Sequence, residues 1–225
     1  FDQKIEEIKR RNIVQLGGEL AHLIVQDPDY IGKVSKDLLY EVGKEIKLKK
    51  GVIELMSILA EGIDDYRFGT YIVSAAPKEC IERAVEKIFP VANIYGTTFI
   101  YKNGIAQDVE RTNAGHAKVA TLDMLKQKEN VPRDAIVYVG DGSSDVHVML
   151  HVKSYHGYPI TVSPAPYMGH ICRRSVISDN VLSILVPILQ DLLNYDQEKV
   201  RAFFENKGHA ILEWNRADTE WLDIA

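Results

Sequence analysis

The chain has 225 residues, of which 46% are hydrophobic and 26% charged, a composition typical of one globular domain, with room for a small insert. The formal net charge of −5 and the lack of a Lys/Arg block disfavour a nucleic-acid partner, and no apolar stretch is long enough to predict a membrane span. Cys80 and Cys172 lie far apart without metal or redox spacing. With no signal-peptide pattern, we expect a reducing, cytoplasmic location.

The first 50 residues are predicted to form two or three helices and no strand. Glu, Lys, Ile and Leu recur there at helical spacing. The pattern breaks at Asp27 and Pro28, because a proline disfavours the helical conformation in the residue before it.

Helices and strands alternate from about residue 51 onward. The expected order is helix 51–63, strand 69–77, helix 77–89, a β excursion over 93–107 that turns at Asn103-Gly104, helix 114–128, strand 135–139, a short helix, strand 158–163 and helix 179–193. Strands that alternate with helices predict right-handed crossovers and a parallel sheet. The expected fold class is therefore α/β, with a doubly wound, mostly parallel, Rossmann-like sheet.

Two loops at predicted strand ends carry polar groups. In a parallel sheet, ligands bind beyond the carboxyl ends of the strands. Near the end of the first strand, Ser74 and Ala75 offer a hydroxyl and backbone N–H groups at the start of a helix, which favours an oxyanion or phosphate. After strand 135–139, Asp141 and Asp145 offer hard oxygen ligands suited to Mg²⁺.

A lysine stands between these two loops in the sequence. Lys118 lies near the beginning of helix 114–128, where its charge can neutralise a phosphate. Anion donors beside a cation site indicate handling of a phosphate ester. Each feature also has an ordinary interpretation, with Ser74 and the two acids as helix caps and Lys118 as a solvated helix residue.

Other patterns with chemical potential are interpreted as structural. His147 and His151 lie four apart on a helix but lack the Glu of a HExxH zinc motif, so we interpret them as solvated. Both cysteines fit buried structural thiols. The basic run Lys9–Arg11 is interpreted as a solvated helix face, with substrate contact as the alternative. No Gly-x-Ser-x-Gly context surrounds the serine after the first strand, which disfavours an esterase.

The order of the motifs resembles the haloacid dehalogenase-like superfamily, and in particular its phosphoserine-phosphatase-like branch. The strand YIVSAAP is similar to the second motif, Lys118 to the third, and Gly140–Asp145 to the fourth, over about residues 50–190. The resemblance implies a helical cap over 1–50 and an α/β phosphatase-like core over 51–195. Residues 196–225 have no counterpart in the family and are expected to form a C-terminal helical extension.

The resemblance also implies the reaction and the role of each site residue. It implies Mg²⁺-dependent hydrolysis of a small phosphate monoester through an aspartyl-phosphate. Asp141 is implied to bind the metal, and Asp145 to complete the metal shell or to orient Lys118 for catalysis. Ser74, Ala75 and Lys118 are implied to hold the phosphoryl group. The implied partner is a small phosphorylated metabolite, with no nucleic acid and no membrane; the alternative is a phosphate-binding pseudoenzyme of the same fold.

The first motif of the superfamily, Asp-x-Asp-x-Thr at the end of a strand, is missing from the chain. Phe1–Ile5 begins in a similar way and then becomes helical, and Ala210–Thr219 has the wrong spacing, with Glu213 in place of Asp. The missing strand belongs between the strands that end at Ser74 and Gly140, and its loss would leave buried amides unpaired at about 1–3 kcal/mol each. We therefore expect it to lie upstream of the first residue, with those two strands not paired to each other.

Overall fold

The computed structural model describes residues 1–211 of the protein. The helices are α1 (Asp2–Arg11), α2 (Glu19–Gln26), α3 (Lys36–Val42), η1 (Gly43–Glu45), α4 (Val52–Glu61), α5 (Lys78–Ala84), η2 (Val91–Asn93), α6 (His116–Glu129), η3 (Arg133–Ala135), η4 (Ser143–Asp145), α7 (Val146–Ser154), α8 (Pro166–Ile171), η5 (Val181–Ile184), α9 (Leu185–Pro187), η6 (Ile188–Leu192) and α10 (Gln197–Glu205). The strands are β1 (Ile72–Pro77), β2 (Ile94–Lys102), β3 (Ile105–Arg111), β4 (Val137–Gly140), β5 (Tyr158–Thr161) and β6 (Arg174–Ser175).

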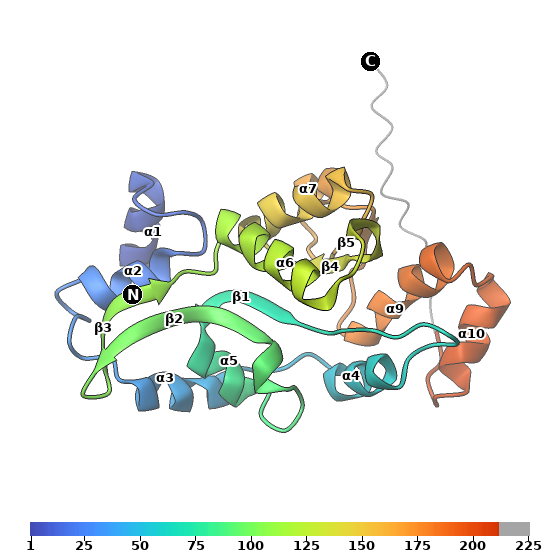
Figure 1. Ribbon diagram of the computed structural model, residues 1–225, viewed down its shortest axis with the longest axis horizontal. Coiled ribbons are helices and arrows are strands. Elements are labelled where there is room, and N and C mark those ends of the chain that lie inside the picture. Colours follow the sequence, from blue (N-terminus) through green and yellow to red (C-terminus); the bar gives the residue numbers. More distant parts are fainter. Residues whose placement is uncertain (212–225) are drawn as a thin grey trace, which may run out of the picture.

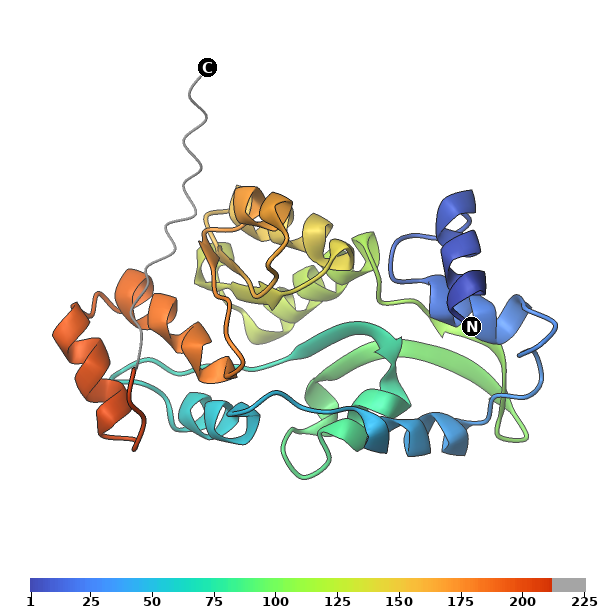
Figure 2. The same ribbon diagram turned by 180° about the vertical axis from the view of Figure 1, so that it is seen from behind.

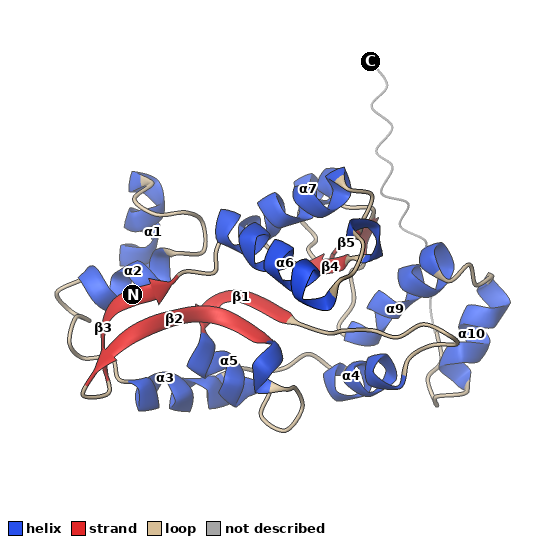
Figure 3. Ribbon diagram, viewed as in Figure 1, coloured by secondary structure: helices blue, strands red, loops and turns tan. Residues whose placement is uncertain are grey.

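The strands form two separate three-stranded sheets. In the first, β1 is parallel to β2 and β2 is antiparallel to β3; in the second, β4, β5 and β6 are all parallel. Within residues 1–211, no backbone ladder joins β1 to β4, and the strands fall into two groups in Figure 3. The α/β class with mostly parallel strands is confirmed. The two strands that carry Ser74 and Gly140 do not pair with each other, which agrees with the expected lack of a central strand.

Helices lie on both sides of the first sheet. In Figures 1 and 2, α3 and α5 lie below the first sheet, α4 continues this layer beneath the loop that leads into β1, and α6 and α7 lie above. Helix α2 packs against β3, and α3 packs along α5. Before residue 50 the structure has three α-helices, α1, α2 and α3, which agree with the two or three helices expected there, and the additional 3₁₀ turn η1. Of these, α1, α2 and the loop between them lie on the same side as α6 (Figure 1), whereas α3 joins the layer of α5.

The β excursion of the sequence is a hairpin. Strands β2 and β3 pair antiparallel and are joined by Asn103 and Gly104, whose φ angles of 51° and 77° are both positive. A two-residue turn of this kind requires positive φ at both positions, which Asn and Gly tolerate better than other residues. The predicted turn at Asn103-Gly104 is confirmed.

The predicted helix 179–193 is wrong as a single regular helix. The structure divides it into the 3₁₀ segment η5, the short α9 and the π-helical η6. Pro187, the last residue of α9, has no backbone N–H to donate to the preceding turn, which interrupts the regular hydrogen-bond pattern there. Helix α8 and the two-residue strand β6 were not predicted, since both are too short to give a periodic pattern.

The C-terminal part of the described chain packs onto α4 and the segment η5–η6. Tyr195, Val200 and Phe204 are buried in one apolar cluster with Leu55 and Leu189. Helix α10 lies in the first part of the predicted C-terminal helical extension over 196–225. Residues 212–225 of that extension, including Glu213, lie outside the described residues. No helix in the described part of the chain is long and apolar enough to cross a membrane.

Helix α5 makes a close backbone contact with the start of η1. A Cβ atom added to Gly43 would lie 2.4 Å from the carbonyl oxygen of Cys80 and 2.6 Å from the Cβ of Arg83. Cys80 is itself buried, and its thiol donates to the carbonyl of Leu39 at 3.0 Å. The helices before residue 50 are thus anchored to the core by a contact that only glycine allows.

We expect Gly43→Ala to lower the free energy of unfolding by about 1–3 kcal/mol, because the new methyl group overlaps the backbone of α5. The matched control is Gly69→Ala, where a Cβ would meet only Tyr71 at 3.4 Å or more. This control is expected to change stability by less than about 0.5 kcal/mol. Urea unfolding followed by circular dichroism measures both, and equal stabilities for the two variants would contradict the close contact.

Both thiols are expected to be chemically inert in the native state. Cys80 and Cys172 are free and buried, and burial raises the pKa of each thiol to about 11. Because the thiolate is the reactive form, modification by iodoacetamide at pH 8 should be at least about tenfold slower in the native protein than in urea. Mass spectrometry of the intact protein counts the modified thiols, and native labelling as fast as in urea would show that the burial is wrong.

Candidate active site

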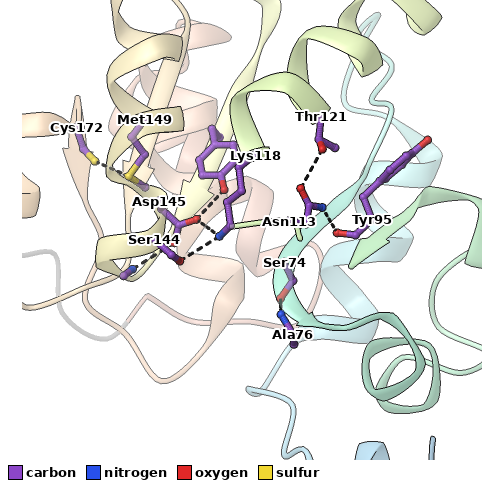
Figure 4. A network of polar contacts seen from close by, with 12 residues as sticks. Ser74, Ala76, Tyr95, Asn113, Lys118, Thr121, Ser144, Asp145, Met149 and Cys172 are labelled. Atoms are coloured by element: carbon purple, nitrogen blue, oxygen red, sulfur yellow. Dashed lines mark hydrogen bonds and ion pairs between the residues drawn. The ribbon is translucent and has the colours of Figure 1, made fainter. Parts of the chain in front are cut away.

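Ser74 lies in the part of β1 where regular pairing with β2 is interrupted. Strand β1 pairs with β2 at Val73, and pairing resumes only at Pro77, with a bulge between them. Within the bulge, the backbone N–H of Ala76 donates to Oγ of Ser74 at 3.2 Å (Figure 4). A bulge turns backbone groups and side chains away from the ladder, which makes them available to another partner.

A buried polar network fixes this loop to the start of α6. The hydroxyl of Thr97 donates to the carbonyl of Ala75 at 2.8 Å, and the backbone N–H of Asn113 donates to Oγ1 of Thr97 at 3.2 Å. The Asn113 side chain then donates to the carbonyl of Tyr95 at 2.6 Å and accepts from the hydroxyl of Thr121 at 2.9 Å (Figure 4). Thr97, Asn113 and Thr121 are almost fully buried, so each of these bonds is made in a region of low dielectric.

Lys118 is buried and paired with Asp145. Its Nζ lies 2.6 Å from Oδ1 of Asp145 and donates to Oγ of Ser144 at 3.2 Å (Figure 4). Lys118 is 4% exposed and Asp145 is 5% exposed. The Asp145 carboxylate also accepts the hydroxyl of Tyr138 at 2.7 Å and the N–H of Gly142 at 3.3 Å. Burial, followed by the charge of Asp145, raises the pKa of Tyr138 well above its usual value.

Gly140 lets Asp145 turn back toward the strand. A Cβ at Gly140 would lie 2.7 Å from Cγ of the Asp145 carboxylate, so a larger residue would displace that side chain. The glycine of the predicted acidic loop therefore has a packing role in addition to its place in the turn.

The α1–α2 loop reaches the point where the predicted site residues converge. Gln15 and Gly18 close a turn through a backbone bond of 2.8 Å, with Gly17 at φ 94°. A Cβ on Gly17 would lie 3.0 Å from Cβ of Ser144 and 3.2 Å from the Cβ atoms of Ala75 and Ala114. Residues of the second, third and fourth motif regions therefore surround Gly17.

The same loop also contacts the first turn of α6. Oε1 of Gln15 accepts the backbone N–H of His116 at 3.1 Å. The α1–α2 loop is thus held between the two halves of the candidate site.

The structure brings together most of the residues predicted for the site. Ala75, Lys118, Ser144 and Asp145 lie around one region, and Ser74 is in the bulge beside it. Asp141 is exposed at the carboxyl end of β4. In the described chain, no three His, Cys, Asp or Glu side chains are grouped so as to hold a metal ion. The metal-binding roles of Asp141 and Asp145 stay predictions.

Sequence reasoning missed the residues that support the site. Thr97, Asn113, Thr121 and Tyr138 were not singled out. One signal was present. Thr97 lies in the predicted β excursion over 93–107, and Asn113 directly precedes the predicted helix 114–128; both are polar residues of low helix propensity. Polar residues at such positions need buried partners, and those partners can be identified only in the fold.

The buried pair predicts a contrast between the two acids of the loop. We expect Asp145→Asn to lower the free energy of unfolding by about 3–5 kcal/mol, because Lys118 would remain buried without its counter-charge. The exposed Asp141→Asn is the matched control and should change stability by less than about 0.5 kcal/mol. Denaturant unfolding of both variants measures the contrast, and similar stabilities would show that Lys118 does not depend on Asp145.

A family model for haloacid dehalogenase-like hydrolases matches residues 25–150 of the chain. Among solved structures, a phosphoserine phosphohydrolase-like protein from Francisella tularensis is 20% identical, with a TM-score of 0.57 and 83% of each chain covered. A substrate-bound phosphoserine phosphatase is 17% identical, with a TM-score of 0.60 and 81% and 82% of the two chains covered.

A HAD family hydrolase from Salmonella enterica serovar Typhi is 15% identical, with a TM-score of 0.64. The match covers 83% of this chain and 61% of the Salmonella chain. A search of curated protein sequences finds no significant match. At these identities the solved structures support the fold alone, whereas the family model spans more than half of the chain. The chain belongs to the haloacid dehalogenase-like hydrolases, with a fold similar to that of the phosphoserine-phosphatase-like branch.

Proposed function

We propose that the protein hydrolyses a small phosphate monoester with Mg²⁺, through an aspartyl-phosphate. The observation that carries this proposal is the position of Lys118. It is the third residue of α6, where the helix dipole disfavours a cation, and it is also almost fully buried. A charge kept in such a position at a cost in stability is typical of a functional site that has to bind an anion.

Each residue has a distinct role in the proposed reaction. The Ser74 hydroxyl and the N–H groups of the β1 bulge, including that of Ala75, bind the phosphoryl oxygens. Lys118 offsets the negative charge that the phosphoryl group carries during transfer. Asp145 holds the ammonium group of Lys118 in position through the 2.6 Å contact, and Ser144 accepts a second hydrogen bond from it.

The acids of the loop fit Mg²⁺. Mg²⁺ prefers oxygen ligands, retains several waters and usually binds one or two carboxylates together with substrate phosphate. The exposed Asp141, with Asp145 behind it, provides such a set without a third protein carboxylate. When bound, the metal would neutralise phosphate charge and orient the ester. Asp141 is the residue that we propose to hold it directly.

The nucleophile is proposed to be an Asp on a strand that these 225 residues do not contain. Within residues 1–211, β1 and β4 each form the edge of a sheet, which supports this proposal because an additional strand between them would complete one continuous sheet. Its carboxyl end would lie beside Ala75 and Ser144, next to Lys118. The phosphoryl group would then be transferred from the ester oxygen to that carboxylate, and water would later release it as phosphate.

The substrate is proposed to be a small metabolite, and neither a nucleic acid nor a membrane. The α1–α2 loop approaches the site closely, which supports a cover over the crevice that excludes larger substrates. We propose that residues 1–50 act as a cap. Within this segment, α3 packs against α5 of the core. Two free, buried thiols suit a reducing, cytoplasmic location.

One observation favours a second candidate function. Gly17 lies within contact distance of Ala75 and Ser144, in the region proposed for the phosphoryl group. A loop fixed there would obstruct the site and favour a phosphate-binding pseudoenzyme. In the catalytic proposal, the loop moves aside when the phosphoryl group binds.

An assay of the full-length protein on a panel of small phosphate esters separates the two functions. With Mg²⁺ we expect turnover that EDTA removes, and Asp141→Asn should lose at least about 100-fold in kcat/KM, as expected for loss of a metal ligand. The control Asp134→Asn changes an exposed acid of η3, just before β4, and should keep full activity. Phosphate binding without any turnover would favour the pseudoenzyme, and wild-type turnover in Asp141→Asn would contradict the metal role.

A further inference from the structure

A cavity of about 460 Å³ lies between α2, the end of β3 and the first turn of α6. Its walls combine apolar side chains, such as Ala21, Val25 and Val109, with polar groups from Gln15, His22 and Thr112. This volume suits a small ligand, and an apolar wall with a few polar groups is typical of a binding pocket.

The cavity adjoins the proposed phosphate site through shared residues. Ala114 lines the cavity and is also one of the three residues around Gly17. Ala117 lines it as well and directly precedes Lys118 in α6. Gln15 and Gly18 belong to both the cavity wall and the loop that contacts the site. A phosphate ester bound at Lys118 would therefore have this cavity next to it for its leaving group.

The ionisable side chains that line the cavity are one carboxylate and one imidazole. Among the residues of the described chain that line it, Asp108 is the only carboxylate and His22 the only basic group, with neither Lys nor Arg. Glu19, 6% exposed, adds a second carboxylate at the α1–α2 loop, where it accepts the N–H of Gly17 at 2.8 Å. On the adjoining helix α1, Lys4 and Lys9 are paired with carboxylates of their own.

A carboxylate placed in this cavity would meet neither Lys nor Arg among the described lining residues, and it would face the carboxylate of Asp108. A negative group without such a partner is disfavoured both by desolvation and by repulsion between like charges. An uncharged leaving group avoids both penalties, whereas a positively charged one replaces the repulsion with attraction to Asp108; either can hydrogen-bond to the polar groups of the wall.

We propose that this cavity receives the leaving group of the phosphate ester and selects one that carries no carboxylate. The inference rests on the proposed function and narrows its substrate class to phosphate esters of neutral or amine-bearing alcohols. An ester of a hydroxy acid or of a hydroxy amino acid is therefore a poor ligand, although the solved structures of similar fold include phosphoserine phosphatases.

Two probes that differ only in a carboxylate test the proposal. Calorimetric titration of the 225-residue protein in Mg²⁺ buffer compares O-phosphoethanolamine with O-phosphoserine and needs no nucleophile. We expect O-phosphoethanolamine to bind at least tenfold more tightly. Equal or tighter binding of O-phosphoserine, or failure of both probes to bind while inorganic phosphate binds, would overturn the inference. If inorganic phosphate does not bind either, the proposed function fails as well.

A charge added to the cavity wall provides the second measurement. Gln26 lines the cavity and is exposed at the end of α2, so Gln26→Arg introduces a cation without disturbing the core. This variant should reduce the preference for O-phosphoethanolamine by at least fivefold. The control Gln107→Arg adds the same charge beside Asp108 on β3, outside the cavity lining, and should leave the preference unchanged. An equal change in both variants would show that the general charge of the protein, and not this cavity, sets the preference.

Discussion

The ion pair between Lys118 and Asp145 is the constraint on which the rest of the site depends. It joins the first turn of α6 to the loop after β4, and both side chains are almost entirely removed from solvent. A buried lysine and a buried carboxylate are each costly alone, and together they stabilise one arrangement of the two elements. Tyr138 and Gly142 bind the same carboxylate, so its position is set from three directions.

This pair has additional importance because the two sheets do not share a ladder. Strand β1 belongs to one sheet and β4 to the other, so the residues at their ends are aligned by helix and loop contacts. On the first sheet, the network of Thr97 and Asn113 ties Ala75 to the segment before α6. On the second sheet, Asp145 ties its loop to Lys118. Helix α6 therefore links the two halves of the site.

Much of the fold and part of the site followed from local pattern. The hairpin was predictable because Asn103 and Gly104 allow the backbone conformation of a two-residue turn, a constraint that acts within four residues. The regions of Ser74 and Asp145 were predictable because small and acidic residues follow apolar strands. The interrupted helix around Pro187 was not predicted, because the apolar spacing on either side of the proline continues without change.

Other parts of the site depend on contacts between distant segments, which no local pattern reports. The insertion of Gly17 between Ala75 and Ser144 joins residues separated by more than fifty positions in the chain. The hydrogen bonds of Asn113 to Tyr95 of β2 and to Thr121 of α6 form only when these two elements lie side by side in the fold. The lack of pairing between β1 and β4 was expected from the missing first motif, whereas the loop that approaches the site could not be foreseen.

A crystal structure of the protein with Mg²⁺ and inorganic phosphate tests most directly whether Lys118 and the β1 bulge form an anion site. We predict that phosphate binds between Oγ of Ser74, the N–H groups of the bulge and Nζ of Lys118, with Gly17 displaced and the Lys118–Asp145 contact retained. Phosphate bound elsewhere, with Gly17 still against Ala75 and Ser144, would contradict it.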